Sequence, residues 1–490
     1  MNIPPELRDA HGHDELAALE QRVRQDLSFL GDPAKSWIPA GDQGGREPRS
    51  DVVIIGAGMC GLAAFFALRR GGVDNIRILD RSAIGVEGPW AKYARMETLR
   101  SPKQLTGPAS GMANLTFQAW CRAKYGEAFW DAMDKIPRLM WMAYLSWYRQ
   151  VLEIPVENQT SVDEITPHDD GLRLILSGSA ASTKTIQTRK VVLATGREGL
   201  AAPSIPAFMD SAPKQMWAHT AEDIDFENLK NKRVVVIGIG ASAVDNAAEA
   251  LEAGATEVRH LIRRSEMPRI NKMMGIGSFG FTAGFPELSE DWRWKFLHYA
   301  GRAQTPAPRA STQRVSRHKN AYFHFNAGVA AVQEKSSALR ITTVQGANLT
   351  TDFIILGTGF IVEPVAEPAL RYYSKEILLW RDAYTPPSGL EDDELAKFPY
   401  LGRDFAFQER TPGAAPWLRH IHCFNFGSTM SLGKVSGDIP AVSVGASWLS
   451  REMAANFYAE DIESHWRGLQ DYDKPELLGD EWVASDIPDA

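Results

Sequence analysis

Two glycine-rich segments carry the clearest chemical signal in this chain. The first reads Asp51-Val-Val-Ile-Ile-Gly-Ala-Gly-Met-Cys-Gly61, and the second reads Val234-Val-Val-Ile-Gly-Ile-Gly-Ala-Ser-Ala243. In each segment, an apolar run typical of a buried strand leads into closely spaced glycines and then into a helical pattern. Such glycines allow a tight turn and let the backbone approach a pyrophosphate at a helix N-terminus. The chain is therefore expected to hold two dinucleotides.

The first glycine segment is followed by an acidic residue at the position that reads a ribose. Gly56, Gly58 and Gly61 fill the three glycine places, and Asp80 stands 24 residues after Gly56, at the end of the next predicted strand. A carboxylate at this place can accept hydrogen bonds from the ribose hydroxyls of a dinucleotide. The whole strand–loop–helix–strand–Asp unit is much more specific than the glycines alone.

The second glycine segment ends in cations instead of an acid. Gly238 and Gly240 are followed by Ser242, whose hydroxyl could add a donor, and the next strand ends in Arg263 and Arg264. Guanidinium groups at this place suit a 2′-phosphate. The pattern predicts NADPH at the second site, with NADH as the alternative if these arginines are only a solvated strand end.

The order of the predicted elements gives the fold class. We expect an α/β fold with two Rossmann-like dinucleotide-binding domains, the second inserted in the first. A helical spacing between Asp14 and Leu30 precedes them. The expected division is 1–49 for an N-terminal helical extension, 50–200 for the first part of the first nucleotide domain, 201–350 for the second nucleotide domain with an aromatic-rich insertion at about 266–326, and 351–490 for the second part of the first domain and the C-terminal region.

Composition excludes several other classes of protein. The formal net charge of −8 argues against nucleic-acid binding and against a basic membrane surface. The three cysteines form no CxxC pair and the histidines lack metal-ligand spacing, so we expect neither a disulfide framework nor a metal site. We find no secretory signal, and the apolar run from Val52 to Leu68 fits a strand and helix better than a membrane span. A cytoplasmic protein is expected.

With these residues in hand, the chain resembles the class B flavin-dependent monooxygenases over roughly residues 50–460. Gly88-Pro-Trp90 stands where this family has a GGxW segment, although Glu87 replaces the first glycine. Ala194-Thr-Gly196 resembles the ATG linker strand, and Leu356-Gly-Thr-Gly-Phe360 resembles the second such strand of the N-hydroxylases. The identifying FxGxxxHxxxY/F sequence is met only at His219, so no subfamily is assigned.

The resemblance implies a cofactor for each site and an oxygen chemistry. FAD would occupy the first site, and NADPH at the second would reduce it; reduced flavin and O₂ would form a C4a-(hydro)peroxyflavin that oxygenates a small organic substrate. The cofactor-binding residues expected on these grounds are Gly56, Gly58, Gly61, Asp80, Arg81, Trp90, Gly196, Gly238, Gly240, Ser242, Arg263, Arg264, Gly359 and Asp438.

A cationic segment after Trp90 corresponds to family segments that pass near the flavin ring. Arg100, Lys103 and Gln104 are the candidate catalytic residues, because they could hydrogen-bond the oxygenated flavin, NADP⁺ or an anionic substrate. Asp438 precedes an Ala/Ser-rich helix whose N-terminus could face the pyrimidine end of the flavin. The alternative is a structural loop whose cations meet surface acids.

The residues do not select one substrate. N-hydroxylation of an amine or other heteroatom, oxygenation of a ketone, and hydroxylation of an electron-rich heterocycle such as urate all fit, and bacterial FAD-dependent urate hydroxylases resemble flavoproteins of this plan. An NADPH-dependent flavin reductase without oxygen insertion and a non-enzymatic redox sensor are the competing classes. The expected partners are O₂ and a small molecule, and homo-oligomerisation is left open.

Overall fold

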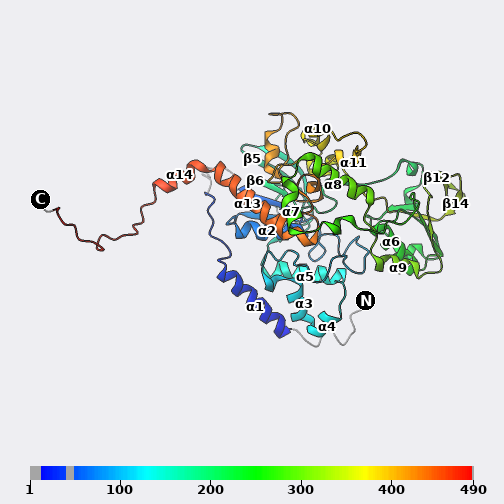
Figure 1. Ribbon diagram of the computed structural model, residues 1–490, viewed down its shortest axis with the longest axis horizontal. Coiled ribbons are helices and arrows are strands. Elements are labelled where there is room, and N and C mark those ends of the chain that lie inside the picture. The colour runs from blue at the N-terminus through cyan, green and yellow to red at the C-terminus, as the bar shows by residue number, and fades with distance from the viewer. Residues whose placement is uncertain (1–12, 40–48, 182, 488–490) are drawn as a thin grey trace.

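The structure is a computed structural model that describes residues 13–39, 49–181 and 183–487. Residues 1–12 and 40–48 of the expected N-terminal extension lie outside this description. Helix α1 (His13–Phe29) confirms the helical spacing seen after Asp14. Its Leu19, Val23 and Leu27 are buried in the core of the first nucleotide domain, and Figure 1 shows α1 lying along the α3–α5 side of the molecule. The extension is therefore part of the folded body.

The first nucleotide domain is built on a mixed sheet with the strand order β3-β2-β1-β6-β5-β4 and with β17 also beside β6. Strands β1, β2, β3, β6 and β17 run parallel, whereas β4 and β5 pair antiparallel. The strands are β1 (Arg49–Ile55), β2 (Ile76–Leu79), β3 (Val156–Glu157), β4 (Ser161–His168), β5 (Gly171–Ser177), β6 (Thr185–Leu193) and β17 (Ile421–His422). Segments 230 residues apart thus meet at the centre of one sheet.

The apolar run after Asp51 forms a central strand and a buried helix, as the glycine pattern predicts. Val52 and Ile54 of β1 are fully buried, and α2 (Met59–Arg70) buries every residue from Met59 to Leu68. Helix α13 (Val442–Glu460) packs on α2. Among the described residues, no helix is long and apolar enough to cross a membrane.

An aromatic layer covers the first domain beside α2. Helices α3 (Phe117–Tyr125), α4 (Glu127–Ala132) and α5 (Arg138–Val151) surround a cluster of buried rings. Trp120, Trp141 and Tyr144 are almost completely buried and contact one another or Phe117. These rings therefore serve as core.

The second nucleotide domain has a parallel sheet with the order β11-β10-β9-β15-β8. Its strands are β8 (Trp217–His219), β9 (Arg233–Ile237), β10 (Glu257–Leu261), β11 (Ala321–His324) and β15 (Phe353–Leu356), and it carries the antiparallel strands β12 (Val329–Lys335), β13 (Ala338–Thr343) and β14 (Asn348–Thr351). Helices α6 (Ala241–Glu252) and α9 (Arg309–Ser316) pack together on it (Figure 1).

Two expected boundaries in this region differ from the structure. Strand β15 pairs with β9 and β8, so the chain leaves the second sheet after residue 356 and not at 350. Strand β11 lies beside β10, so the last residues of the expected 266–326 insertion belong to the sheet. Both strands are short, and only their pairing partners, which are distant in sequence, show which sheet they extend.

The insertion packs on the C-terminal part of the first domain. Its helices are α7 (Phe279–Gly284) and α8 (Glu290–Ala303), and its neighbours include α10 (Trp380–Ala383), α11 (Asp393–Ala396) and α12 (Thr429–Leu432). The Trp294 Nε1 donates a 2.8 Å hydrogen bond to the Leu390 carbonyl, and Arg293 donates to the Ser431 carbonyl. The insertion thereby joins the two nucleotide domains.

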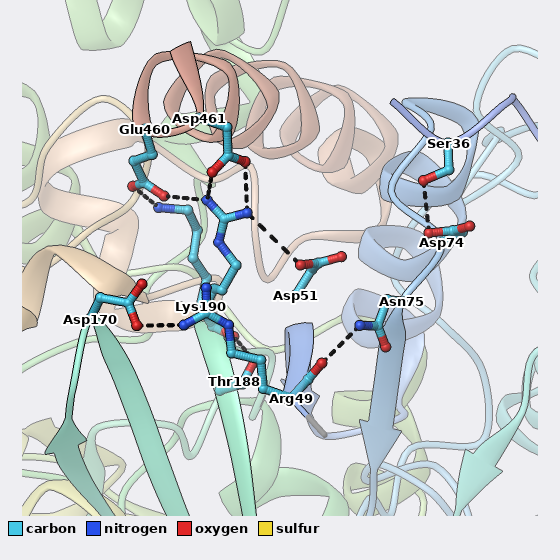
Figure 2. Close-up of polar contacts among 11 residues, drawn as sticks. Ser36, Arg49, Asp51, Asp74, Asn75, Asp170, Thr188, Lys190, Glu460 and Asp461 are labelled. Atoms are coloured by element: carbon cyan, nitrogen blue, oxygen red, sulfur yellow. Dashed lines mark hydrogen bonds and ion pairs between the residues drawn. The ribbon is translucent and has the colours of Figure 1, made fainter. Parts of the chain in front are cut away.

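Charged side chains lock the sheet edge opposite the glycine loop (Figure 2). Lys190 on β6 donates a 2.5 Å bond to Glu460 at the end of α13, while Arg189 bonds Glu460 and Asp461 and lies 4.0 Å from Asp51 on β1. The Lys190 side chain is 1% exposed. This ionic network holds α13, and helix α14 (Ile462–Gln470) follows directly on it.

Candidate active site

The first glycine loop opens at the carboxyl edge of β1. Gly56 has φ +100°, and a Cβ there would lie 2.6 Å from the Ala194 carbonyl oxygen; a Cβ on Gly61 would lie 1.8 Å from the Gly56 carbonyl oxygen. Only glycine fits either place. The α2 N-terminus begins at Gly58 and has no side-chain cap, so its first-turn N–H groups stay available as donors. A pyrophosphate group fits this cradle.

Asp80 lies directly beside that loop at the end of β2. It is 7% exposed, and its carboxylate accepts hydrogen bonds of 2.8 Å from the Ala57 N–H and 2.7 Å from the Ser82 N–H. The side chain therefore joins the glycine loop to the 81–90 loop. Each carboxylate oxygen can accept more than one bond, so the expected contact with a ribose remains a prediction that this geometry permits.

The loop after Asp80 returns to the first glycine loop. A Cβ on Gly88 would lie 3.8 Å from the Gly58 Cα, which places the two backbones side by side. Glu87, which replaces a family glycine, is buried and accepts bonds from Arg149 and Asn158, so it holds this loop from below. Trp90 packs against the hydrophobic core of the first nucleotide domain. Its carbonyl accepts a bond from Arg138.

The other residue expected to bind cofactor in this loop is Arg81. Its guanidinium lies 3.6 Å from the Glu198 carboxylate and is largely exposed. This pair bridges the end of β2 and the segment after β6, two places distant in sequence. Contact of Arg81 with the cofactor remains a prediction.

The second glycine loop repeats the geometry at the end of β9. Gly238 has φ +114°, and a Cβ there would lie 2.4 Å from the Gly357 carbonyl oxygen. Gly240 is the N-cap of α6, and a Cβ built on it would have no atom within 4 Å apart from its chain neighbours. This side of the loop is therefore open to a ligand. Ala243 takes the third glycine place because its neighbour on the return strand is Gly357, whose own Cβ would lie 2.3 Å away. Ser242 lies in the first turn of α6.

A buried histidine supports this second loop, and the sequence pattern missed it. His260 on β10 is fully buried, stacks on Phe323 at 5.1 Å, and its Nδ1 lies 3.0 Å from the Gly238 carbonyl oxygen. Burial lowers the pKa of His260 to about 4. The ring is therefore neutral near pH 7 and donates its Nδ1–H to Gly238.

The two arginines expected to read a 2′-phosphate follow β10 beside this loop. The Gly238 N–H donates to the Leu261 carbonyl, which brings the end of β10 against the glycine turn. Arg263 is exposed, whereas Arg264 donates a 3.1 Å bond to the Arg302 carbonyl in the insertion. The structure thus leaves Arg263 accessible beside the loop, and Arg264 is partly engaged.

Gly196 and Gly359 lie in the crossings between the domains. Strands β7 (Ala201–Pro203) and β16 (Phe360–Val362) pair antiparallel there. The Gly359 carbonyl accepts a bond from the Ser204 N–H and lies 3.0 Å from the His219 Nε2. Gly196 and Gly359 have φ of +73° and +82°. These positions set the path of the paired linkers, and their contact with cofactor remains a prediction.

The three candidate catalytic residues do not come together. Arg100 donates a 2.9 Å bond to the Pro306 carbonyl of the second domain. Burial lowers the pKa of Arg100, and the carboxylates of Asp245 and Asp438 act in the opposite direction. Arg100 therefore lies within electrostatic reach of α6 and of the segment before α13.

Lys103 and Gln104 point elsewhere. The Lys103 Nζ donates a 2.6 Å bond to the Trp130 carbonyl and lies 4.8 Å from the centre of the Trp130 ring, so it anchors α4. Gln104 is exposed, and both residues border a surface hollow of about 400 Å³ with residues 131–135. Their catalytic role remains a prediction, and the geometry favours Arg100 over them.

Asp438 lies beside the N-terminus of α2. The Cys60 thiol in the first turn of α2 donates a 3.0 Å bond to the Ser436 carbonyl. Asp438 is exposed and 3.6 Å from Lys434. The segment before α13 thus borders the first cradle, and contact of Asp438 with the flavin remains a prediction.

A further arginine at this site escaped the sequence reasoning. Arg197 follows Gly196 at the carboxyl edge of β6, and its guanidinium lies 3.7 Å from the centre of the Phe426 ring. Surrounding protein lowers the pKa of Arg197 by desolvation, against the influence of Asp438 and Tyr93. The side chain is nevertheless accessible to solvent. Its signal was a cation placed directly after the ATG linker segment.

Comparison with known proteins agrees with this arrangement. A family model described as pyridine nucleotide-disulphide oxidoreductase matches residues 53–275. The FAD-dependent urate hydroxylase of Xanthomonas campestris is 36% identical over 471 residues, which cover 95% of this chain and 98% of that protein. No cysteine pair supports disulphide chemistry here, because Cys60, Cys121 and Cys423 are free, buried and far apart in sequence.

Solved structures share the fold at low identity. The ornithine hydroxylase from Pseudomonas aeruginosa is 16% identical, with a TM-score of 0.62 over 83% of this chain and 99% of that chain. The ornithine N-hydroxylase from Kutzneria sp. 744, solved with reduced FAD, NADP⁺ and L-ornithine, is 16% identical, with a TM-score of 0.63 over 84% and 100%. The fold and the two glycine loops define an α/β flavoprotein with two dinucleotide-binding domains. The chain belongs to the flavin-dependent monooxygenases, and is an oxidoreductase.

Proposed function

We propose that this protein is an FAD-dependent monooxygenase that uses NADPH and O₂ to hydroxylate urate or a closely related anionic purine. The observation that carries the proposal is the 36% identity to a FAD-dependent urate hydroxylase across nearly the full length of both chains. Among the alternatives from the sequence, this moves the heterocycle ahead of amines and ketones. The N-hydroxylases share only the fold at 16% identity.

The residues at the first cradle fit FAD. Gly56, Gly58 and Gly61 leave room for a pyrophosphate, the uncapped α2 N-terminus offers donors to it, and Asp80 can accept from the ribose. When bound, FAD supplies the redox and oxygen chemistry. At the second cradle, Gly238 and Gly240 take the corresponding roles for NADPH, with the accessible Arg263 available to the 2′-phosphate.

The chain's own residues would orient an anionic substrate. Arg100 and Arg197 supply two guanidinium groups that share Asp438 as a charged neighbour. A guanidinium in a partly desolvated setting holds an anion more strongly than one in water. The Arg197 guanidinium lies against the Phe426 ring, and Arg293 of α8 bonds the Ser431 carbonyl of the first domain.

The overall reaction proposed is NADPH plus a proton, O₂ and substrate giving NADP⁺, water and hydroxylated substrate. The test measures NADPH oxidation by the purified flavoprotein with urate, ornithine, lysine and a cyclic ketone, together with product mass under ¹⁸O₂. We expect urate to stimulate oxidation and its product to contain one ¹⁸O atom. Oxygen transfer to an amine or ketone, or NADPH oxidation that yields only hydrogen peroxide with every substrate, would overturn the proposal.

A further inference from the structure

The loop that runs along the flavin side of the first domain is bonded to both domains. Its Leu99 N–H donates a 2.7 Å bond to the Ile136 carbonyl of the first domain, whereas two of its arginines reach the second domain. This flavin-side loop, residues 91–104, follows Trp90. Arg100 bonds the Pro306 carbonyl, and Arg95 lies 3.5 Å from Asp223 and 5.5 Å from the centre of the Phe226 ring. Pro306, Asp223 and Phe226 all belong to the second domain. Arg95 and Arg100 therefore tie this loop of the first domain to the second domain.

Arg314 on α9 makes the most buried of these connections. Its side chain is 6% exposed, and its Nη1 donates a 3.0 Å bond to the Arg95 carbonyl in the flavin-side loop. Its Nε and Nη2 donate bonds of 2.8 and 2.7 Å to Glu252 and Glu249 of α6. One planar guanidinium thus joins the flavin-side loop to the helix that opens the second cradle.

The flavin-side loop and α9 are not packed closely against each other along their whole length. A hollow of about 480 Å³ lies there, lined by Glu97, Ala310, Gln313, Arg314, Ser316 and Arg317. Where apolar contact is incomplete, a few directed hydrogen bonds set the relative position of two segments. The Arg314 fork supplies such bonds in three directions at once.

We propose that Arg314 is a positioning residue that couples occupation of the second dinucleotide site to the placement of the flavin-side loop. A dinucleotide bound at Gly238 and Gly240 fixes the first turn of α6. Glu249 and Glu252, near the other end of the same helix, orient Arg314, which in turn holds the Arg95 carbonyl. Arg100 is carried on the same loop. The proposal rests on the proposed use of NADPH, because that cofactor is the ligand of the second site.

The chain offers a matched control one turn away. Arg317 also bonds Glu252, at 2.7 Å, but its side chain is 60% exposed and bonds only within the second domain. Arg314→Met and Arg317→Met each remove one cation from Glu252, and only the first releases the Arg95 carbonyl. Arg314→Lys keeps the charge but cannot reproduce the planar fork, so it tests the geometry if Arg314→Met folds poorly.

The experiment measures hydrogen–deuterium exchange of peptides covering 91–104 in the full-length, FAD-loaded protein, with and without NADP⁺. We expect NADP⁺ to slow exchange in the native protein and in Arg317→Met, and to lose this effect in both Arg314 variants. Anaerobic flavin reduction at saturating NADPH should slow by about 10- to 100-fold in the Arg314 variants, the loss typical of a misplaced reacting pair.

Each other outcome is decisive. If NADP⁺ binds but leaves the loop unchanged in the native protein, or protects it equally in the Arg314 variants, the coupling is wrong while the proposed cofactor stands. Equal losses in Arg317→Met would show that only the charge balance of α6 matters. If NADP⁺ does not bind to the native protein, both the coupling and the proposed cofactor are overturned.

Discussion

Asp245 in α6 is a buried carboxyl group whose replacement by asparagine should stabilise the protein near neutral pH. Its side chain is 2% exposed and its Oδ1 has no hydrogen-bond partner among the described residues. Burial raises the pKa of Asp245 from 3.8 to about 6, although Arg314 and Arg100 act in the opposite direction. The charged form of Asp245 is therefore less stable in the folded protein than in water.

The sign and size of the effect follow from the two pKa values. Below pH 3.8 the group is protonated in both states and contributes nothing. Between pH 3.8 and 6 the unfolded chain loses a proton that the folded chain keeps, so the free energy of unfolding falls as the pH rises. The difference of about 2.2 units at 1.36 kcal/mol per unit amounts to about 3 kcal/mol above pH 6.

Asparagine has nearly the same shape and carries no charge, so Asp245→Asn should escape this cost. We expect no change in the unfolding temperature near pH 4 and an increase that grows to about 6–12 °C at pH 7.5 for a domain of this size. Thermal unfolding by circular dichroism across that pH range measures it. Asp210→Asn, an exposed carboxylate of the same domain, is the control and should show no such trend. A destabilised Asp245→Asn at pH 7.5, or a difference independent of pH, would refute the reasoning.

Three other substitutions probe the two cradles and the ionic network. Replacing Arg263 and Arg264 together with alanine should raise KM for NADPH by about 10- to 100-fold, because charged hydrogen bonds to the 2′-phosphate are lost. KM for NADH should stay nearly unchanged. Equal effects on the two cofactors in steady-state kinetics would contradict the phosphate assignment. Gly56→Val should abolish FAD retention, because its φ is +100° and its Cβ would meet the Ala194 carbonyl at 2.6 Å; a yellow purified variant would count against the first cradle. Lys190→Met removes one partner of Glu460, which is 34% exposed and keeps its bond to Arg189, so the substitution should cost about 1–3 kcal/mol. The cost should appear as a lower unfolding temperature with unchanged FAD content, and an unaltered temperature would argue that the network adds nothing.

The two cradles could be predicted from sequence because they are local. A strand, a glycine turn and the following helix lie within 20 residues, and the glycines at 56 and 238 are required by φ and by a close carbonyl. Asp80 and Arg263 could be assigned to strand ends for the same reason. Ala243 stands at the third glycine place, but its close partner Gly357 lies far away in sequence and could not be predicted.

The flavin side was predicted less well because it depends on contacts between distant segments. Arg100, Lys103 and Gln104 are neighbours in sequence, yet Lys103 is drawn to the Trp130 carbonyl while Arg100 reaches Pro306. The spacing of three charged or polar residues in an irregular loop does not determine where each points. The same limit concealed Arg197, whose position depends on Phe426.

Local pattern was thus enough to identify two dinucleotide cradles, their order along the chain and the different charge at their ribose ends, since these features are set by backbone geometry over a few residues. The assignment of β15 and β11 to the second sheet, the contact of Arg197 with Phe426, and the bridge that Arg314 forms between α6 and the flavin-side loop all come from folding. Each joins residues tens to hundreds of positions apart. The pairing of such segments depends on how their side chains pack against distant neighbours, and no single stretch of sequence contains that information.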